Sequence, residues 1–256
     1  MSRLRLVAAV LLTLVACGSG DTPGRAGRQP VKPAEPAEPA PAVPEATLVD
    51  VAVANLWAEP DQARPLDAPS LTNPVDTNAW RAAMTVDDRR WLVDRLVTQA
   101  LYGDEVKVLE TAGGWSRVVV LRQPSHLDPR GYPGWLPTAQ LASVPRPPDT
   151  GTQAVVTRPS ATLRAVDPAG ATLEVSFNTR LPVVRIDNEH GVTVAGPDGQ
   201  GWLRPADVAV LTPTTPSPTG EDVVRRAQLF SGVEYLWAGT SGAGWDCSGF
   251  THAAYA

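Results

Sequence analysis

Residues 134–141 read GWLPTAQL, and residues 201–211 read GWLRPADVAVL, so the same block occurs twice in this chain. Two further pairs precede them in the same order: ANLWAEP (54–60) with ATLRAVDP (161–168), and VKVLE (106–110) with LPVVRID (181–187). Short β-type runs that repeat at this spacing between Gly and Pro predict two small β-barrels. Each repeat is just long enough to enclose a core of its own.

The repeats and the Pro-rich stretches between them divide the chain into segments. We predict a signal peptide (1–16), a Pro/Ala-rich tether (17–46), a first barrel (47–145), a second barrel (152–211), a linker (212–220) and a C-terminal segment (221–256). The fold class is therefore multi-domain and mainly β, with an α+β piece at the end of the chain. Residues 221–256 number 36, which is below the roughly 40 residues that an unaided domain needs.

The first barrel carries an insertion, residues 71–101, that a plain barrel does not need. The insertion has helical spacing, which predicts a helix: three- and four-residue steps join Trp91, Leu92, Arg95, Leu96 and Gln99. Thr85 is the predicted N-cap of that helix, with two aspartates in the first turn. We expect the insertion to cover or shape a site.

The N-terminal residues have the pattern of an export signal. Arg3 and Arg5 precede the short apolar run Leu6 to Val15, which is too short to span a bilayer. The run ends in Leu14-Val15-Ala16-Cys17, which resembles the lipobox of bacterial lipoproteins. The resemblance implies cleavage before Cys17, lipidation of its sulfur and attachment to a membrane that faces the periplasm or cell wall. The alternative is an ordinary signal peptide with a chance cysteine.

The composition limits the possible functions. The net charge is −5, and removal of residues 1–16 would make it −7, which argues against nucleic-acid binding through a basic face. Cys17 and Cys247 are the two cysteines of the chain. If lipid consumes Cys17, no disulfide framework is possible and Cys247 remains as a lone thiol. No cofactor or metal site is predicted.

The strongest chemical signal is GWDCSGF (244–250). Asp246 is a suitable N-cap, so we expect Cys247 in the first turn of a helix, where the helix dipole stabilises a thiolate. The free N–H groups of that turn can also hold an oxyanion. Ser248 and Gly249 keep the turn small, so that a substrate can approach. The alternative is a buried, inert cysteine at the start of a helix.

Together with Tyr235-Leu236-Trp237-Ala238-Gly239 and the helical stretch before it, this block resembles the NlpC/p60 cysteine peptidases, which have a papain-like core. Ala238 departs from the glycine that the family pattern has there. The resemblance implies that Cys247 attacks an amide carbonyl of a peptidoglycan stem peptide, with Tyr235 near the oxyanion. A histidine on a following strand would serve as base. The Gly-Trp-Leu blocks likewise resemble bacterial SH3-like domains.

The order of two SH3-like domains before the peptidase segment resembles the YkfC-type endopeptidases. Those enzymes cleave the γ-D-glutamyl–diamino acid bond of murein peptides that have a free L-Ala N-terminus. The resemblance implies that Tyr132 lines the L-Ala pocket with Asp246 and Ser248. Asp104 or Glu105 is a candidate anion for the terminal amine, and both are also readable as ordinary loop residues.

Three histidines occur in the chain. His252 lies five residues after Cys247 on the same expected helix, about 140° around the axis and about 7.5 Å along it, so it cannot reach the thiol. His126 and His190 fall in loop-like stretches of the two barrels. We therefore expect the chain as written to lack the catalytic histidine and peptidase activity. The alternatives are a non-catalytic SH3-like lipoprotein that binds murein, and a different acyl-transfer enzyme on the same core.

Overall fold

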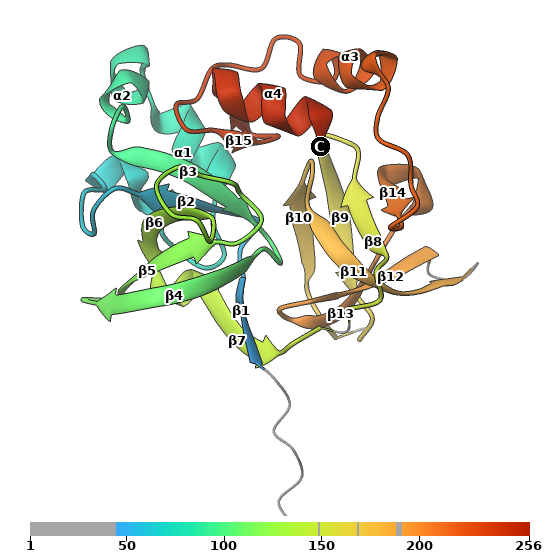
Figure 1. Cartoon of the computed structure of the whole chain (residues 1–256). Helices are drawn as coiled ribbons and strands as arrows, with labels where there is room; N and C mark the ends of the chain where they lie inside the picture. Colours follow the sequence, from blue (N-terminus) through green and yellow to red (C-terminus); the bar gives the residue numbers. More distant parts are fainter. Residues whose placement is uncertain (1–44, 148, 168, 188–190) are drawn as a thin grey trace, which may run out of the picture. The chain divides into compact units, whose positions relative to one another are not determined.

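Seven antiparallel strands form the first barrel in the computed structural model, which describes residues 45–147, 149–167, 169–187 and 191–256 (Figure 1). They are β1 (Glu45–Val49), β2 (Val53–Trp57), β3 (Leu96–Leu101), β4 (Glu105–Ala112), β5 (Trp115–Val120), β6 (Tyr132–Pro137) and β7 (Leu141–Pro145). Their order in the sheet is β3-β2-β6-β5-β4-β1-β7. Because β1 begins at Glu45, residues 45 and 46 belong to the barrel and not to the tether. Cys17 and residues 1–16 lie outside the described residues.

The second barrel repeats this topology. Its strands are β8 (Gln153–Val156), β9 (Ser160–Ala165), β10 (Thr172–Ser176), β11 (Arg180–Asp187), β12 (Gly191–Gly196), β13 (Gly199–Leu203) and β14 (Val208–Leu211). Their order is β10-β9-β13-β12-β11-β8-β14, so each strand takes the place of the strand seven earlier. In both barrels a short 3₁₀ turn, Thr138–Gln140 or Pro205–Asp207, follows the Gly-Trp-Leu strand. The repeated sequence blocks thus correspond to repeated strands, and the predicted fold class is confirmed.

The insertion is helical over a shorter range than predicted. A 3₁₀ turn (Pro65–Ser70) is followed by α1 (Thr77–Ala83) and α2 (Val86–Trp91). Thr85 caps α2 as predicted, since its side chain accepts a hydrogen bond from the Asp88 amide. The predicted continuation of the helix through Leu96 and Gln99 is wrong, because these residues lie on β3. Asp94 has a φ of 64°, a left-handed conformation that ends the helical run.

Tyr102 connects the two barrels. It follows β3 in the first barrel, yet its ring is 2% exposed and packs in the core of the second barrel with Leu163, Leu181 and Val194. Its hydroxyl donates a hydrogen bond of 3.2 Å to Asp198 Oδ2. Gly196 leaves room for the ring, since a Cβ there would come within 2.9 Å of it. The two barrels are therefore joined by a buried side chain, Tyr102, as well as by a linker.

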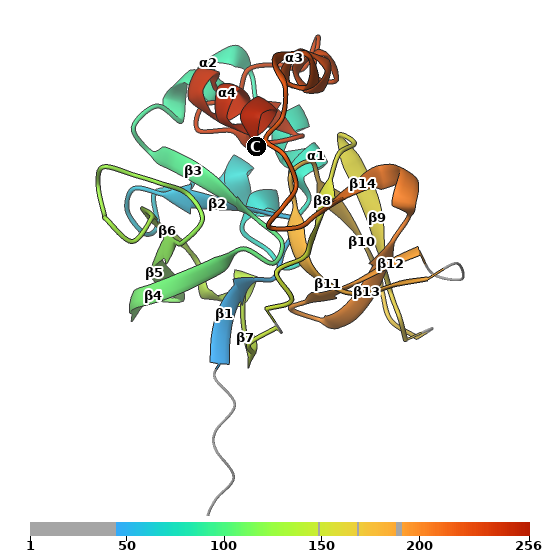
Figure 2. The same ribbon diagram turned by 45° about the vertical axis from the view of Figure 1, so that its right-hand side comes forward.

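The C-terminal segment is held by both barrels. It consists of α3 (Gly220–Gln228), the short strands β15 (Thr240–Ser241) and β16 (Gly244–Trp245), and α4 (Cys247–Tyr255), with α3 and α4 side by side in both views (Figures 1 and 2). Leu236 and Ala238 are buried with Trp57, Trp80 and Trp135 of the first barrel. Phe230, Trp245 and Ala253 are buried with Phe177 of the second. The segment thus obtains from the barrels the core that its own length does not supply.

No helix within the described residues is long and apolar enough to cross a membrane.

Candidate active site

The site is built around the N-terminus of α4. Asp246 is the N-cap, as predicted, and its Oδ1 accepts hydrogen bonds from the Gly249 amide (2.6 Å) and from the Ser248 hydroxyl (2.9 Å). Cys247 is therefore the first residue of the helix, and it is a free, exposed thiol. The exposure excludes the alternative of a buried, inert cysteine. A reacting oxygen beside the thiol would meet amides of the first turn that have no partner within the helix.

The glycines of the motif allow two backbone segments to touch. A Cβ on Gly249 would lie 2.2 Å from the Gly239 oxygen, so only glycine permits the first turn of α4 to approach residues 236–239 this closely. The Asp246 amide donates to the same Gly239 oxygen at 3.1 Å. Ala238, which stands where the family pattern has glycine, has a φ of 57°. Ala238 therefore adopts the left-handed backbone conformation that a glycine would favour at this position.

Tyr235 lies beside Cys247. The Tyr235 backbone forms an isolated parallel bridge with Trp245, and the Leu236 amide donates to the Trp245 oxygen at 3.0 Å. Burial raises the pKa of Tyr235, the negative charge of Asp246 and the neighbouring Cys247 side chain raise it further, and the Cys247 main chain opposes the rise. The phenol thus stays protonated as a hydrogen-bond donor at neutral pH. The structure brings together the two residues that sequence analysis named as catalytic.

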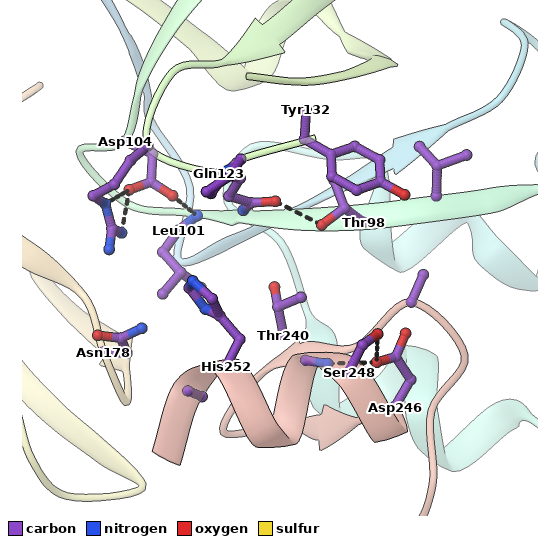
Figure 3. A pocket seen from close by; sticks show the side chains of 16 residues that line it. Thr98, Leu101, Asp104, Gln123, Tyr132, Asn178, Thr240, Asp246, Ser248 and His252 are labelled. Atoms are coloured by element: carbon purple, nitrogen blue, oxygen red, sulfur yellow. Dashed lines mark hydrogen bonds and ion pairs between the residues drawn. The ribbon is translucent and has the colours of Figure 1, made fainter. Parts of the chain in front are cut away.

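A cavity of about 250 Å³ (Figure 3) lies at the first turn of α4, where Asp246 and Ser248, the two neighbours of Cys247 in the chain, line it. Tyr132, Asp246 and Ser248 line it together, although Cys247 and Tyr235 themselves are not among its lining residues. Burial raises the pKa of Tyr132, and the negative charge of Asp246 raises it further. Both hydrogen bonds that Asp246 accepts use Oδ1, so among the described residues Oδ2 is left for a ligand. The cavity therefore offers a carboxylate and a phenol from different domains to the same ligand.

The two acids suggested as anions for an amine are already paired. Asp104 is 4% exposed and accepts hydrogen bonds from Arg122 Nη2 (2.5 Å) and from the Leu101 amide (2.9 Å). Glu105 forms an ion pair with Arg146 at 2.7 Å and does not line this cavity. Asp104 lines the cavity, but Arg122 already neutralises its charge. Asp246 is therefore the carboxylate that remains for a cationic ligand group.

The histidines do not complete the site within the described residues. His252 lines the cavity, and burial and then the positive charges of Arg122 and Arg180 lower its pKa. No hydrogen bond joins it to Cys247 in the described part of the chain. His126 is exposed, and His190 lies outside the described residues. The described ranges also contain no group of three or more His, Cys, Asp or Glu side chains placed to hold a metal ion.

Residues of both barrels that the sequence did not point to hold the segment that follows Tyr235. Gln99 is fully buried on β3, and its Oε1 accepts a hydrogen bond of 3.0 Å from the Thr240 amide. The Thr240 hydroxyl donates a hydrogen bond of 3.0 Å to the main-chain oxygen of Gln99. On the other side, the Gly242 amide donates to the Ser176 hydroxyl at 2.8 Å. The polar Gln99 within the largely apolar run LVTQAL was the signal in the sequence that could have indicated this contact.

Comparisons with known proteins agree with this architecture. Residues 156–210 match the YkfC SH3b2 domain family, and residues 94–141 match the family of bacterial dipeptidyl-peptidase SH3 domains. The chain is 43% identical over 216 residues to a gamma-D-glutamyl-L-lysine dipeptidyl-peptidase of Bacillus cereus. It is 36% identical over 206 residues to a protein of the same name from Bacillus subtilis.

The alignments cover most of this chain and a smaller part of its relatives. They include 81% and 80% of the chain, but 64% of the Bacillus cereus protein and 68% of the Bacillus subtilis protein. A crystal structure of an NlpC/P60 family protein from Bacillus cereus superposes with a TM-score of 0.75 at 40% identity, over 83% of this chain and 72% of that one. With this identity, this coverage and the geometry around Cys247, the chain belongs to the NlpC/P60 family.

Proposed function

We propose that this protein is a cysteine endopeptidase of the cell wall, and that it cleaves the γ-D-glutamyl–diamino acid bond of peptidoglycan stem peptides. The observation that carries the proposal is the exposed Cys247 at the N-terminus of α4, with Tyr235 beside it. The cavity beside it supports a substrate with a free N-terminus. The names of the two Bacillus relatives support the same bond class.

In the proposed complex, Tyr132, Asp246 and Ser248 hold the N-terminal L-Ala of the peptide. The amine of L-Ala is a cation at neutral pH, and Asp246 Oδ2 is the acceptor left for it. A cation that is bonded to a carboxylate in a half-buried cavity gains more than an exposed ion pair does. Because Tyr132 comes from β6 and Asp246 from the peptidase segment, the first barrel forms one wall of the substrate site.

The chemistry proceeds through a thioester. The Cys247 thiolate attacks the γ-carbonyl carbon of D-Glu, a C–S bond forms, and the carbonyl electron pair moves to oxygen. Amides of the first turn of α4 and the Tyr235 hydroxyl stabilise this oxyanion. Collapse breaks the C–N bond, and the diamino acid leaves as an amine after it accepts a proton. Water then hydrolyses the thioester and restores the thiol.

The test uses L-Ala-γ-D-Glu-diaminopimelate as substrate. A protein in which this chain is joined to a segment that supplies a histidine base is expected to release L-Ala-D-Glu, and its Cys247→Ala variant is expected to release none. The 256-residue chain itself is expected to be inactive, because among the described residues no histidine contacts Cys247 to take its proton. Binding of the peptide without cleavage by the joined protein would favour the murein-binding alternative and overturn the proposal.

The location of the protein is also a proposal. The run Leu14-Val15-Ala16-Cys17 after a short apolar stretch supports cleavage before Cys17 and a lipid anchor on its sulfur. Two or three acyl chains would hold the protein stably at a membrane. Metabolic labelling with palmitate is expected to mark the protein, and Cys17→Ser is expected to abolish the label and release the protein from the membrane fraction. Labelling that survives Cys17→Ser would contradict the anchor.

A further inference from the structure

The helical insertion of the first barrel contacts the segment that carries Tyr235. Arg89 lies in the last turn of α2, and its Nη2 forms an ion pair of 2.6 Å with Glu234 Oε2. The same guanidinium donates from Nη1 to the main-chain oxygen of Tyr235 at 3.5 Å. One side chain of the insertion therefore contacts both Tyr235 and the residue before it.

The geometry of Arg89 makes it a rigid support. Its side chain is 16% exposed, and Nη2 also donates to the main-chain oxygen of Arg81 at 3.3 Å, so the guanidinium is fixed to α1 as well as to α2. A planar guanidinium with several bonds keeps a defined direction better than a lysine ammonium does. The Tyr235 backbone is also paired with Trp245. Arg89 and Trp245 thus hold the main chain of Tyr235 from two different elements.

The Tyr235 side chain needs such support because little else holds it. It is 54% exposed, and its charged neighbours are Asp246 and Cys247. A hydroxyl on an exposed ring points consistently at a thiol only if the backbone that carries the ring is fixed. A displacement of about 1 Å would weaken both the oxyanion role and the contact with Cys247.

We propose that Arg89 is a positioning residue: through Glu234 and the Tyr235 main chain, it places the Tyr235 hydroxyl against the Cys247 thiol. The insertion then has a function that a plain SH3-like barrel lacks, since it fixes one component of the active site from outside the peptidase segment. This inference rests on the proposed function, since a positioning role matters only if Cys247 and Tyr235 are catalytic. Its geometry and its test do not require turnover.

The test measures the alkylation of Cys247 in the full chain by iodoacetamide over a range of pH, with mass spectrometry to separate its peptide from that of Cys17. Tyr235→Phe is expected to slow alkylation at pH 7 about three- to tenfold, because the thiolate loses one hydrogen bond to a neutral donor. Arg89→Gln is expected to give the same rate profile as Tyr235→Phe. The double variant is expected to add no further change, because Arg89 acts through Tyr235.

Matched variants keep the test decisive. Arg90 lies on the same helix but pairs at the surface with Asp87, so Arg90→Gln is expected to match the wild-type profile. Glu234→Gln removes the same ion pair from the other side and is expected to resemble Arg89→Gln even if the latter folds poorly. The exchange Arg89→Glu with Glu234→Arg is expected to recover at least half of the loss. A wild-type profile for Arg89→Gln, or effects that add to those of Tyr235→Phe, would overturn the inference.

Failure of this inference and failure of the proposed function give different results. If the protein is not a peptidase, the thiol assay still reports the Arg89–Tyr235 coupling. If Arg89 has no positioning role, the alkylation profiles show it while Cys247-dependent cleavage of the tripeptide by the joined protein is unaffected.

Discussion

The indole nitrogen of Trp237 donates a hydrogen bond of 2.9 Å to the main-chain oxygen of Leu96, which lies at the start of β3 in the first barrel. Two further bonds join Thr240 to Gln99 on the same strand. The segment from Trp237 to Thr240 is therefore aligned along β3 by polar contacts, while the buried Leu236 and Ala238 anchor it in the tryptophan-rich core. The peptidase motif thus takes its shape from a neighbouring domain.

Replacement of Trp237 tests this alignment. Trp237→Phe keeps an aromatic ring but removes the donor to Leu96, and it is expected to lower the free energy of unfolding by about 1 kcal/mol. Urea denaturation followed by circular dichroism measures the change. Trp91→Phe is the control, because its ring stacks between Arg64 and Arg95 and its indole nitrogen makes no hydrogen bond among the described residues. An equal loss in both variants would show that ring size, and not the bond to Leu96, is responsible.

The left-handed backbone at Ala238 leads to a second prediction. Glycine there would lose a buried methyl group worth about 0.8 kcal/mol, but it would be relieved of a strain of roughly 1–2 kcal/mol. Ala238→Gly is therefore expected to change stability by less than about 0.5 kcal/mol, after the entropy cost of glycine is included. Ala253→Gly, at an equally buried position inside α4, is expected to cost at least about 1 kcal/mol more. Thermal unfolding of both variants decides whether the conformation or the methyl group dominates.

The two roles of Asp246 can be separated. Asparagine caps helices as well as aspartate does, whereas alanine does not, so Asp246→Ala is expected to cost about 1 kcal/mol of stability and Asp246→Asn much less. Both variants lose the charge proposed to hold the L-Ala amine. Calorimetric binding of L-Ala-γ-D-Glu-diaminopimelate is expected to weaken about tenfold or more in both. Tight binding by Asp246→Asn would show that another group recognises the amine.

The contact between the barrels is expected to depend on pH. Burial raises the pKa of Asp50, the negative charge of Asp198 raises it further, and a hydrogen bond from Asn73 opposes the rise. A carboxyl whose pKa is higher in the folded state than in the unfolded state binds a proton more tightly when the protein is folded. Its contribution to the free energy of unfolding is therefore present at acid pH and is lost as the pH rises through the folded-state pKa. Asp198→Asn is therefore expected to raise the free energy of unfolding at pH values above the folded-state pKa of Asp50, and to have little effect below pH 4.

The expected gain is small, roughly 0.3–0.5 kcal/mol, because solvent screens the exposed Asp198. Urea denaturation at pH 4 and pH 8 measures it. Asp167→Asn serves as control, since Asp167 is an exposed acid of the same barrel and does not contribute to the pKa of Asp50. A gain of equal size in the control would attribute the effect to net charge and not to the pair Asp50 and Asp198.

The sequence was a reliable guide where the signal is local or repeated. The recurring blocks correctly assigned β2, β4 and β6 to the same positions in the first barrel that β9, β11 and β13 have in the second. Strands in equivalent positions need similar turns and similar inward-facing residues. Caps at Thr85 and Asp246 were predictable, since the capping side chain bonds an amide only three residues away.

Long-range polar contacts were not predictable in this way. The spacing of Leu92, Leu96 and Gln99 fits a helix, and only the packing of β3 against β2 decides for a strand. The pairing of Asp104 with Arg122, and of Arg89 with Glu234, depends on how distant elements meet, about which a linear pattern carries no information. Asp104 was therefore named as a possible ligand group although the fold neutralises it.

Tyr102 limits how this architecture can be divided. Tandem repeats are often treated as modules that recombination or protein engineering can exchange one at a time. Here a side chain contributed by the first copy fills the interior of the second, so excision of either copy would expose an aromatic ring or leave a void. The peptidase motif packs against both barrels, so the two barrels must be inherited or transferred together. Chimeras that keep only one barrel are expected to lose the geometry of the active site as well.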